Sequence, residues 1–476
     1  MKILMVASEA LPFSKTGGLA DVVYSLSQEE VKLGHEVSVV IPLYGIKLLE
    51  NTALKSIGSV PVPLGWRQQV ARVFQTEVAG VTYYLIENEY YFGRDGIYGY
   101  YDDMERFAFF TIAVRNLIDK FGLTFDLIHL HDWQAGMLPV IIKEQNKRQK
   151  LFKNLKFVLT IHNPAFQGMF DPNLVVDFYD LPLSVYENGN VRYRDKASTL
   201  KAAIMYSDKI TTVSPTHAEE LLTREGSKGL DDVISLRKND FSGIVNGIDV
   251  KEFDPCTDPF IVKKYDVKSI QAKEENKVAL ATQLGLRNVH APLFGIVSRL
   301  TWQKGIDLFI AGAKEALIHG ANVVALGSGE YGLEQALERL RADYPDQVAI
   351  YIGYHNQLSH QIYAASDFFM MPSLFEPCGI GQLIAMRYGA LPIVRRTGGL
   401  KDTVTLYNGH NLNEATGYGF DEYDEYWMKL TVNYALEQYH NLKVHHQLVT
   451  NAMSYDVSWT KSAIEYLDLF KAMLKK

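Results

Sequence analysis

The sequence predicts an α/β protein with two parallel-sheet domains, on the basis of three observations. Apolar runs of four to eight residues alternate with amphipathic stretches along most of the 476 residues, which is typical of strands and helices in βα units. The strand candidates form two series, separated by a turn-rich stretch at 239–255. A chain of this length exceeds a single core, because domains usually contain roughly 100–200 residues.

The first series supplies six strands and four helices. Its strands are expected at 3–7, 37–41, 82–86, 127–130, 157–161 and 210–213. The helices are expected at 19–33, with Gly34 marking the end, and at 104–120, 135–145 and 198–206. Because parallel strands need a long crossover, usually a helix, this alternation predicts one parallel sheet.

The second series predicts another sheet of the same kind. Its strands are expected at 293–297, 323–326, 348–352, 368–371 and 391–394. The last periodic segment, 459–474, follows no strand, and we expect it to pack as a helix on the other domain. The predicted domains are therefore 1–242 together with the C-terminal helix 457–476, and 243–456, with a hinge near Gly247.

Composition and charge exclude several function classes. The formal net charge is −7, and no run of Lys or Arg is longer than the pair at 395–396, so nothing indicates a nucleic-acid or membrane partner. Two cysteines cannot form a disulfide framework and suit a reducing compartment. The start MKILMVASEA resembles a first strand more than a signal peptide. We therefore expect a cytoplasmic enzyme acting on a diffusing substrate.

The segment 372–404 carries unusually dense site chemistry. It places Glu376 after an apolar run, Cys378 and Gly379 at an expected helix start, and a Gly pair after two arginines. Parallel strands deliver their loops to the carboxyl edge of the sheet, where ligands bind and helix N-termini attract anions. The segment predicts half of a phosphate-type site.

A related pattern follows the first strand. Lys15 precedes Gly17 and Gly18, and Asp21 comes three residues later, in FSKTGGLADVV. RRTGGLKDTV near the end repeats the glycines and the following Asp, either by chance or as a weak internal repeat. Glycines let backbone N–H groups approach an oxyanion closely. A plain βα turn with a solvated lysine is the alternative.

Two further loops bear on phosphate binding. In SRLTWQKG, Arg299 and Lys304 flank a loop before a helix, and two cations suit a diphosphate. Pairing of either cation with a surface carboxylate is the alternative. GSGEYG at 327–332 matches a dinucleotide fingerprint, but it follows the second strand of its domain and lacks a well-placed acidic partner. It borders a nucleotide site or forms a simple helix-start turn.

Polar residues also end two strands of the first series. HLHDWQAG includes His129, His131 and Asp132, and TIHNPAFQG includes His162. Such side chains suit a ligand rich in hydroxyl groups, although Asp132 in a capping role is the alternative. The two histidines of the first motif have no third ligand at metal spacing, so we expect no metal. The Tyr-rich loop at 90–103 offers rings to a sugar or covers the cleft.

Together these motifs resemble the bacterial glycogen synthase and plant starch synthase family, and the resemblance covers nearly the whole chain. The matching motifs occur in the family's order: KTGGLADV, HDW, HN-A-QG, NGID, SRLTWQKG, FEPCG and RRTGGL. The resemblance implies a GT-B architecture, in which two Rossmann-like domains face each other across a cleft. It also implies transfer of glucose from ADP-glucose to the non-reducing end of an α-1,4-glucan such as glycogen, with retained configuration and without a cofactor or metal.

The resemblance assigns a role to individual residues. Lys15 resembles the family's nucleotide-sugar lysine, Arg299 and Lys304 its diphosphate clamp, and Glu376 the carboxylate beside the donor glucose. His162 resembles the residue near the anomeric carbon. The other residues expected to line the donor site are Gly17, Gly18, Asp21, Asp132, Asn246, Tyr354 on the adenine side, Cys378 and Gly379.

The chain departs from related patterns at two positions. Gln134 stands where many members have a second His after HDW, and Ile384 stands where related GT-B families have a second Glu. Three alternatives remain open at this point: a UDP-glucose donor, a small glucoside product such as sucrose, and a non-catalytic relative that only binds glucan or nucleotide. Retention through a covalent intermediate or through same-face attack is likewise open.

Overall fold

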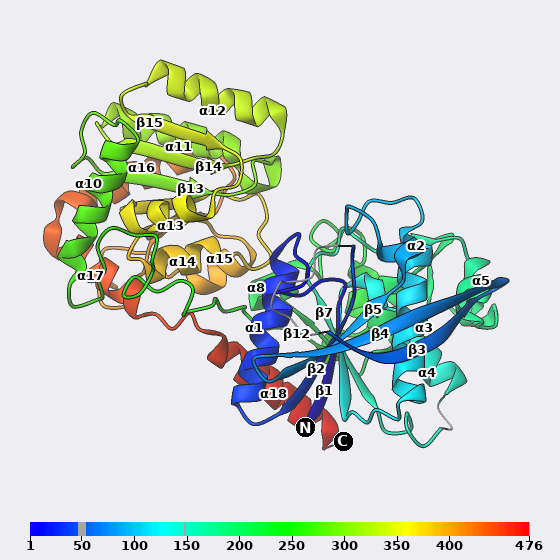
Figure 1. The fold of residues 1–476 in the computed structure, drawn as a ribbon. Helices are drawn as coiled ribbons and strands as arrows, with labels where there is room; N and C mark the ends of the chain where they lie inside the picture. Colours follow the sequence, from blue (N-terminus) through cyan, green and yellow to red (C-terminus); the bar gives the residue numbers. More distant parts are fainter. Residues whose placement is uncertain (46–53, 147–148, 476) are drawn as a thin grey trace. The chain divides into compact units, whose positions relative to one another are not determined.

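The computed structural model describes residues 1–45, 54–146 and 149–475 (Figure 1). The chain divides into two compact units, each with its own largely parallel sheet. The first unit comprises Met1–Val213, Ala218–Ile244 and Trp459–Lys476, and the second comprises Ser214–His217 and Val245–Ser458. Both units are α/β, so the predicted fold class is confirmed.

The first unit has a nine-stranded sheet in the order β12-β11-β7-β6-β1-β2-β5-β4-β3. Its strands are β1 (Lys2–Val6), β2 (Glu36–Pro42), β3 (Lys55–Leu64), β4 (Arg67–Val78), β5 (Val81–Glu87), β6 (Leu127–His131), β7 (Lys156–Ile161), β11 (Lys209–Thr212) and β12 (Phe241–Gly243). The strands from β12 to β5 pair in parallel. They are buried along most of their length, as expected where helices cover both faces of a sheet. All six strands predicted for this half are present.

The hairpin of β3 and β4 extends this sheet with antiparallel pairing, and the sequence did not predict it. β3 contains Gly58, Pro61 and Pro63, residue types that are rare inside strands. It is the edge strand of the sheet, where proline is tolerated because half of the N–H groups have no partner strand. Pattern recognition therefore missed this strand.

A small antiparallel sheet and a set of helices complete the first unit. The small sheet has the order β8 (Met169–Phe170), β10 (Lys196–Ser198) and β9 (Arg192–Tyr193). The helices are α1 (Gly18–Lys32), α2 (Glu89–Phe92), α3 (Asp103–Lys120), α4 (Leu138–Gln145), α5 (Leu174–Tyr179), α6 (Ser184–Glu187), α7 (Thr199–Tyr206), α9 (Asp231–Ser235) and α18 (Trp459–Leu474), with the 3-10 turns η1 (Trp133–Ala135) and η2 (Lys238–Asp240). A further short helix, α8 (Pro215–Glu220), begins within the residues of the second unit.

One predicted helix begins later than expected. The helix predicted at 135–145 starts at Leu138, because Trp133–Ala135 form a separate 3-10 turn. Gly136 lies between the two, where a β-carbon would clash with the backbone oxygen of Thr199. The predicted boundary was therefore wrong, and glycine at this position permits the close packing against Thr199.

The C-terminal helix α18 belongs to the first unit although it follows the second in sequence. It packs against α1 and buries Trp459, Tyr466 and Phe470 in a shared apolar cluster. Thr460 Oγ1 also donates a hydrogen bond to Glu29 Oε1 at 2.7 Å. The prediction that the terminal helix packs on the domain that precedes the second series agrees with these contacts.

The second unit has a six-stranded parallel sheet in the order β15-β14-β13-β16-β17-β18. Its strands are β13 (Leu293–Val297), β14 (Asn322–Gly327), β15 (Val348–Ile352), β16 (Phe368–Met371), β17 (Leu391–Arg395) and β18 (Tyr418–Phe420). From β13 the following strands, β14 and β15, are added on one side, whereas from β16 the following strands, β17 and β18, are added on the other side. The loops after β13 and β16 therefore leave in opposite directions. Open α/β sheets bind ligands at such a switch point.

Helices cover this second sheet (Figure 1). They are α10 (Lys273–Gln283), α11 (Ile306–Ile318), α12 (Tyr331–Asp343), α13 (Asn356–Ala365), α14 (Gly381–Arg387), α15 (Gly398–Thr403), α16 (Glu425–His440) and α17 (Leu442–Ser454), with the 3-10 turns η3 (Ile270–Ala272) and η4 (Trp302–Lys304). Among the helices of the described residues, none has the length and apolar character needed to cross a membrane.

Candidate functional site

A lysine and a glutamate meet at the switch point of the second unit. Lys304 Nζ lies 2.5 Å from Glu376 Oε2, and Ser373 Oγ donates to the same oxygen at 3.2 Å. The lysine side chain is 17% exposed and the glutamate side chain 6% exposed. A buried ion pair of this kind is costly to break, because the remaining charge is left without compensation. Lys304 and Glu376, separated by 72 positions, are thus brought together.

Gly305 explains how the lysine reaches the glutamate. Its φ is +67°, and a β-carbon there would clash with the carbonyl oxygen of Pro372. Leu374 N donates to Gln303 O at 2.9 Å, which ties the two loops together. Only glycine permits this close approach of the loop after β13 to the loop after β16.

The GSGEYG motif packs against the same loop. Leu300 N donates to Ser328 O at 2.9 Å, and Glu330 N donates to Leu300 O at 2.8 Å. A β-carbon at Gly327 or Gly329 would clash with the backbone oxygens of this loop. The glycines are therefore required for packing between two loops, and the pattern needs no dinucleotide to explain it.

Arg299 differs from the other arginines of the region. It is exposed, and no carboxylate pairs with it among residues 1–45, 54–146 and 149–475. Arg395 instead donates to Leu374 O at 2.6 Å and to Asp421 O at 3.0 Å, and Arg396 lies 3.4 Å from Asp421. Arg395 therefore anchors the loop after β16, whereas Arg299 remains available to an anion.

The two Thr-Gly-Gly-Leu motifs turn out to be physically different. A β-carbon at Gly399 would clash with the carbonyl oxygen of Cys378, and one at Gly398 would clash with that of Glu376. Gly17 and Gly18 have no atom within 4 Å of such a β-carbon, and both are exposed. The C-terminal pair allows tight packing against the loop of Glu376, whereas the N-terminal pair has no steric requirement inside the protein.

Cys378, Gly379 and Asn246 surround the end of that loop. Burial raises the pKa of the Cys378 thiol to about 12, so it is a neutral thiol. The backbone N–H of Asn246 donates to this sulfur, while the buried Asn246 Oδ1 has no hydrogen-bond partner among the described residues. Gly379 has a φ of +73°, and α14 begins two residues later than expected, at Gly381.

Tyr354 lies apart from this cluster. It follows β15, which is the edge strand of the sheet and lies two strands from β13. The side chain is 87% exposed, and its hydroxyl donates to Asn356 Oδ1 at 3.4 Å. No contact in the structure joins it to Lys304 or Glu376 within the described residues.

In the first unit, an acidic residue that sequence reasoning missed orders the glycine turn. Glu9 Oε2 accepts hydrogen bonds from Thr16 N at 2.5 Å and from Thr16 Oγ1 at 2.9 Å. Lys15 Nζ lies 2.7 Å from Asp21 Oδ1, with the lysine side chain 49% exposed. Burial raises the pKa of both Glu9 and Asp21, more than the nearby donors lower it. Sequence could not reveal Glu9, because its burial depends on the tertiary fold.

His162 is held from two sides at the end of β7. Its backbone N donates to Asp132 Oδ1 at 2.7 Å, and its Nε2 lies 3.0 Å from His131 Nδ1. Burial lowers the pKa of His162 to about 3, so its imidazole is neutral at physiological pH. Burial raises the pKa of Asp132 to about 7 despite two backbone N–H donors. His131, which the sequence suggested as a group for a hydroxyl-rich ligand, positions the ring of His162.

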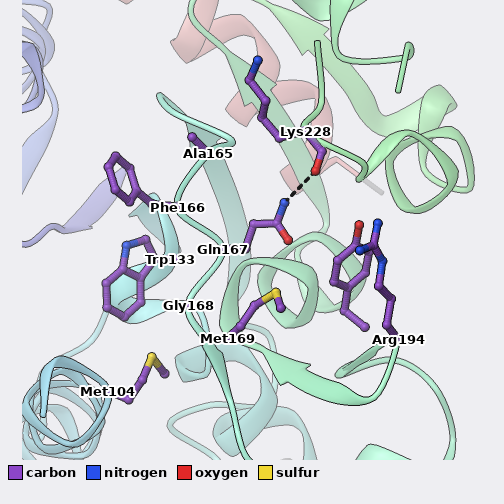
Figure 2. Close-up of a pocket in the computed structure, with 10 residues that line it drawn as sticks. Met104, Trp133, Ala165, Phe166, Gln167, Gly168, Met169, Arg194 and Lys228 are labelled. Atoms are coloured by element: carbon purple, nitrogen blue, oxygen red, sulfur yellow. Dashed lines mark hydrogen bonds between the residues drawn. The ribbon is translucent and has the colours of Figure 1, made fainter. Parts of the chain in front are cut away.

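Beside these residues lies a pocket of about 580 Å³ (Figure 2). It is lined by Trp133, which follows Asp132, and by Ala165–Gly168, which follow His162. Its volume falls within the roughly 300–1,000 Å³ typical of small-molecule sites. In the described part of the chain, no three His, Cys, Asp or Glu side chains are grouped closely enough to hold a metal ion.

Comparisons with known proteins agree with these observations along the whole chain. Residues 2–236 match the family described as the starch synthase catalytic domain, and residues 291–420 match glycosyl transferases group 1. The chain is 42% identical to a glycogen synthase of Bacillus cereus strain Q1 over 100% of both proteins. It is 44% identical to a glycogen synthase of Clostridium botulinum strain Alaska E43 over 99% of both.

Two solved structures are also similar to this chain. The catalytic domain of starch synthase IV from Arabidopsis thaliana, bound to ADP and acarbose, has a TM-score of 0.90 at 33% identity, covering 100% of this chain and 99% of that one. Sucrose-phosphate synthase from Thermosynechococcus elongatus has a TM-score of 0.63 at 16% identity, covering 100% of this chain and 99% of that one. The second likeness concerns the fold alone.

Proposed function

Because the chain belongs to the glycogen and starch synthase family of glycosyltransferases, we propose that it transfers glucose from ADP-glucose to the non-reducing end of an α-1,4-glucan, with retained configuration. Its fold is of the GT-B class. The observation that carries the proposal from geometry is the Lys304–Glu376 pair at the switch point of the second sheet. It supplies one cation for a diphosphate and one carboxylate for a sugar.

The leaving group explains the need for cations. Breaking the bond between glucose and the diphosphate builds negative charge on the departing ADP, and fixed cations stabilise this charge best where water is excluded. Arg299 is exposed without a carboxylate partner in the described residues, and Lys304 is held in place by Glu376. We assign both cations to the diphosphate, the arginine through its bidentate fork and the lysine as a point charge.

The contacts of the Glu376 carboxylate favour an electrostatic role toward the donor sugar over a nucleophilic one. Both hydrogen bonds of its carboxylate end on Oε2, from Lys304 and from Ser373. Oε1 has no such partner within the described part of the chain, so it is the oxygen that a sugar hydroxyl would meet. A carboxylate bound to a lysine is a weak nucleophile. We therefore assign Glu376 to stabilising positive charge on the sugar, which favours same-face attack over a covalent intermediate.

Roles are also proposed for residues of the first unit. The neutral imidazole of His162, positioned by Asp132 and His131, is suited to hydrogen bonding with sugar hydroxyls. The half-exposed pair of Lys15 and Asp21 is weak by nature, so Lys15 can exchange its carboxylate for a phosphate oxygen. Asn246, Tyr354, Cys378 and Gly379 remain proposed as further donor contacts, as does a cytoplasmic location.

A single assay tests the function. The protein is incubated with ADP-glucose or UDP-glucose, with and without glycogen, and release of the nucleoside diphosphate is measured. We expect ADP release that requires glycogen, slower reaction with UDP-glucose, and glucan product that an α-glucosidase digests. Faster reaction with UDP-glucose would replace the proposed donor. Absence of release with either donor and any glucan would indicate a non-catalytic relative.

The two glycine pairs predict opposite outcomes for the same substitution. Gly18→Ala should lower kcat/KM for ADP-glucose by about tenfold, the scale of losing one hydrogen bond to a charged group, while the thermal unfolding midpoint stays unchanged because the added β-carbon meets no atom within 4 Å. Gly399→Ala should lower the free energy of unfolding by about 2 kcal/mol, as overpacking does. Activity assays and thermal unfolding on both variants provide the check.

Each glycine variant serves as the control for the other. An equal loss of stability in both would show that Gly18 is needed for packing, and would remove the reason for assigning the N-terminal turn to the substrate. Unchanged stability in Gly399→Ala would contradict the close approach to Cys378.

A further inference from the structure

Next to the pocket of Figure 2 lies a second hollow of about 390 Å³ in the same unit, and both are lined by Tyr193 and Arg194. Tyr193 ends β9 and Arg194 follows it in the turn to β10, so the two hollows share this part of their walls. Figure 2 places Trp133 and Phe166 at one end of the first pocket and Arg194 at the other. We refer to the two hollows together as the groove; its first pocket is lined by Trp133, which directly follows Asp132, the residue that accepts a hydrogen bond from His162 N.

The wall near His162 has the chemistry of a sugar-binding surface. Phe166 is 63% exposed and Met169 is 45% exposed, although large apolar side chains are normally buried. The ring of Phe166 offers a flat apolar face, and pockets that orient ligands combine such faces with a few polar groups. Gln167 supplies the polar group here, with its Nε2 donating to Lys228 O at 3.2 Å.

The second hollow carries both signs of charge. Arg194, Lys201 and Arg224 line it together with Asp231 and Asp232. An anion would meet the two carboxylates, and a cation would meet the three positively charged side chains. A neutral ligand with many hydroxyl groups suits this mixture, because each hydroxyl both donates and accepts hydrogen bonds.

The part of the groove where the two hollows share Tyr193 and Arg194 is held rigidly. The Tyr193 hydroxyl donates to Gly229 O at 2.5 Å. Arg194 and Lys228 have φ values of +56° and +55°, in a region that residues other than glycine rarely adopt. Such backbone conformations persist only where the surrounding structure enforces them, and they are frequent at ligand clamps. A rigid groove loses little entropy when a ligand binds.

We infer that this second hollow, reached across Arg194, is a distal subsite that binds glucose units of the α-1,4-glucan acceptor remote from the reacting end. The inference rests on the proposed function, since it specifies where the acceptor of that reaction extends. Short acceptors fill only the pocket beside Trp133, which Arg194 also lines, whereas longer ones additionally contact Arg224. The groove therefore gives the enzyme a preference for longer acceptors.

The test compares maltotriose with maltoheptaose as acceptors for Arg224→Ala, because Arg224 lines only the second hollow. We expect the advantage of maltoheptaose in kcat/KM to fall by about tenfold in this variant, the effect of losing a hydrogen bond from a charged group. Lys196→Ala is the matched control, because Lys196 is an exposed cation of the same small sheet that lines neither hollow. It should keep the native ratio. Equal losses on both acceptors, or no loss, would overturn the inference.

Binding in the absence of a donor supplies a second readout. Calorimetric titration with maltoheptaose should give a Kd about tenfold weaker for Arg224→Ala than for the unaltered protein and for Lys196→Ala. Inorganic phosphate should not compete with maltoheptaose. Binding of phosphate together with no binding of maltoheptaose would overturn the inference in favour of an anion site. If the unaltered protein transfers glucose to neither acceptor, the proposed function itself fails. That outcome is distinct from failure of the subsite alone, in which the unaltered protein uses both acceptors and Arg224→Ala keeps their native ratio.

Discussion

Replacing Lys304 by methionine is expected to lower kcat/KM for ADP-glucose by about 10³-fold, the upper range for removing one preorganised donor. The same change should lower the free energy of unfolding by about 3 kcal/mol, because Glu376 would remain charged and nearly buried without its partner. Steady-state kinetics and chemical denaturation measure the two effects separately. Both consequences follow from the 2.5 Å contact between Lys304 Nζ and Glu376 Oε2.

The double variant Lys304→Met with Glu376→Gln separates the two roles. Removing both charges should recover most of the lost stability, since no uncompensated charge remains, while activity stays low. Lys429→Met provides the control, because Lys429 pairs with Glu425 on an exposed helix face, with side chains 40% and 63% exposed. Near-native glucosyl transfer by Lys304→Met would contradict the assignment of this cation to the diphosphate.

Replacing Arg299 by alanine is expected to lower kcat/KM for ADP-glucose by roughly 10²-fold to 10³-fold without changing stability. The activity should fall because the guanidinium is proposed to bind the diphosphate. Stability should hold because the exposed side chain has no carboxylate partner in the described residues. Arg299→Lys should recover part of the activity only, since an ammonium cannot bind two oxygens in a planar fork.

A matched arginine on the same unit serves as the control for this variant. Arg341→Ala removes a guanidinium that is 52% exposed and pairs with Glu338 on α12, and it should leave transfer and thermal unfolding unchanged. A large loss of stability in Arg299→Ala would show that this arginine supports the loop after β13 and does not act only on substrate.

The repeated Thr-Gly-Gly-Leu motif shows where pattern recognition reaches its limit. Both copies follow a strand and precede a helix, so the sequence treats them alike. The structure separates them, because Gly399 lies against the carbonyl of Cys378 while Gly18 faces open space. Local pattern specifies that a turn needs glycine, but only long-range packing shows which atom requires it.

The same distinction applies to the supporting residues that the sequence did not reveal. Glu9 orders the turn that follows Lys15, and His131 contacts His162 across neighbouring strands. Neither role has a signal in local periodicity. Each depends on burial and on partners that the fold brings from elsewhere in the chain.

By itself, the sequence determined the α/β class, the two series of strands and the positions of the polar motifs at strand ends. These properties follow from alternation of apolar and amphipathic segments, and parallel strands necessarily bring their carboxyl ends to one edge. Only the tertiary structure decided that Lys304 is held by Glu376, that Arg299 has no carboxylate partner among the described residues, and that two hollows share Tyr193 and Arg194. The contact between Lys304 and Glu376 joins residues 72 positions apart, and its geometry is set by packing rather than by local propensity.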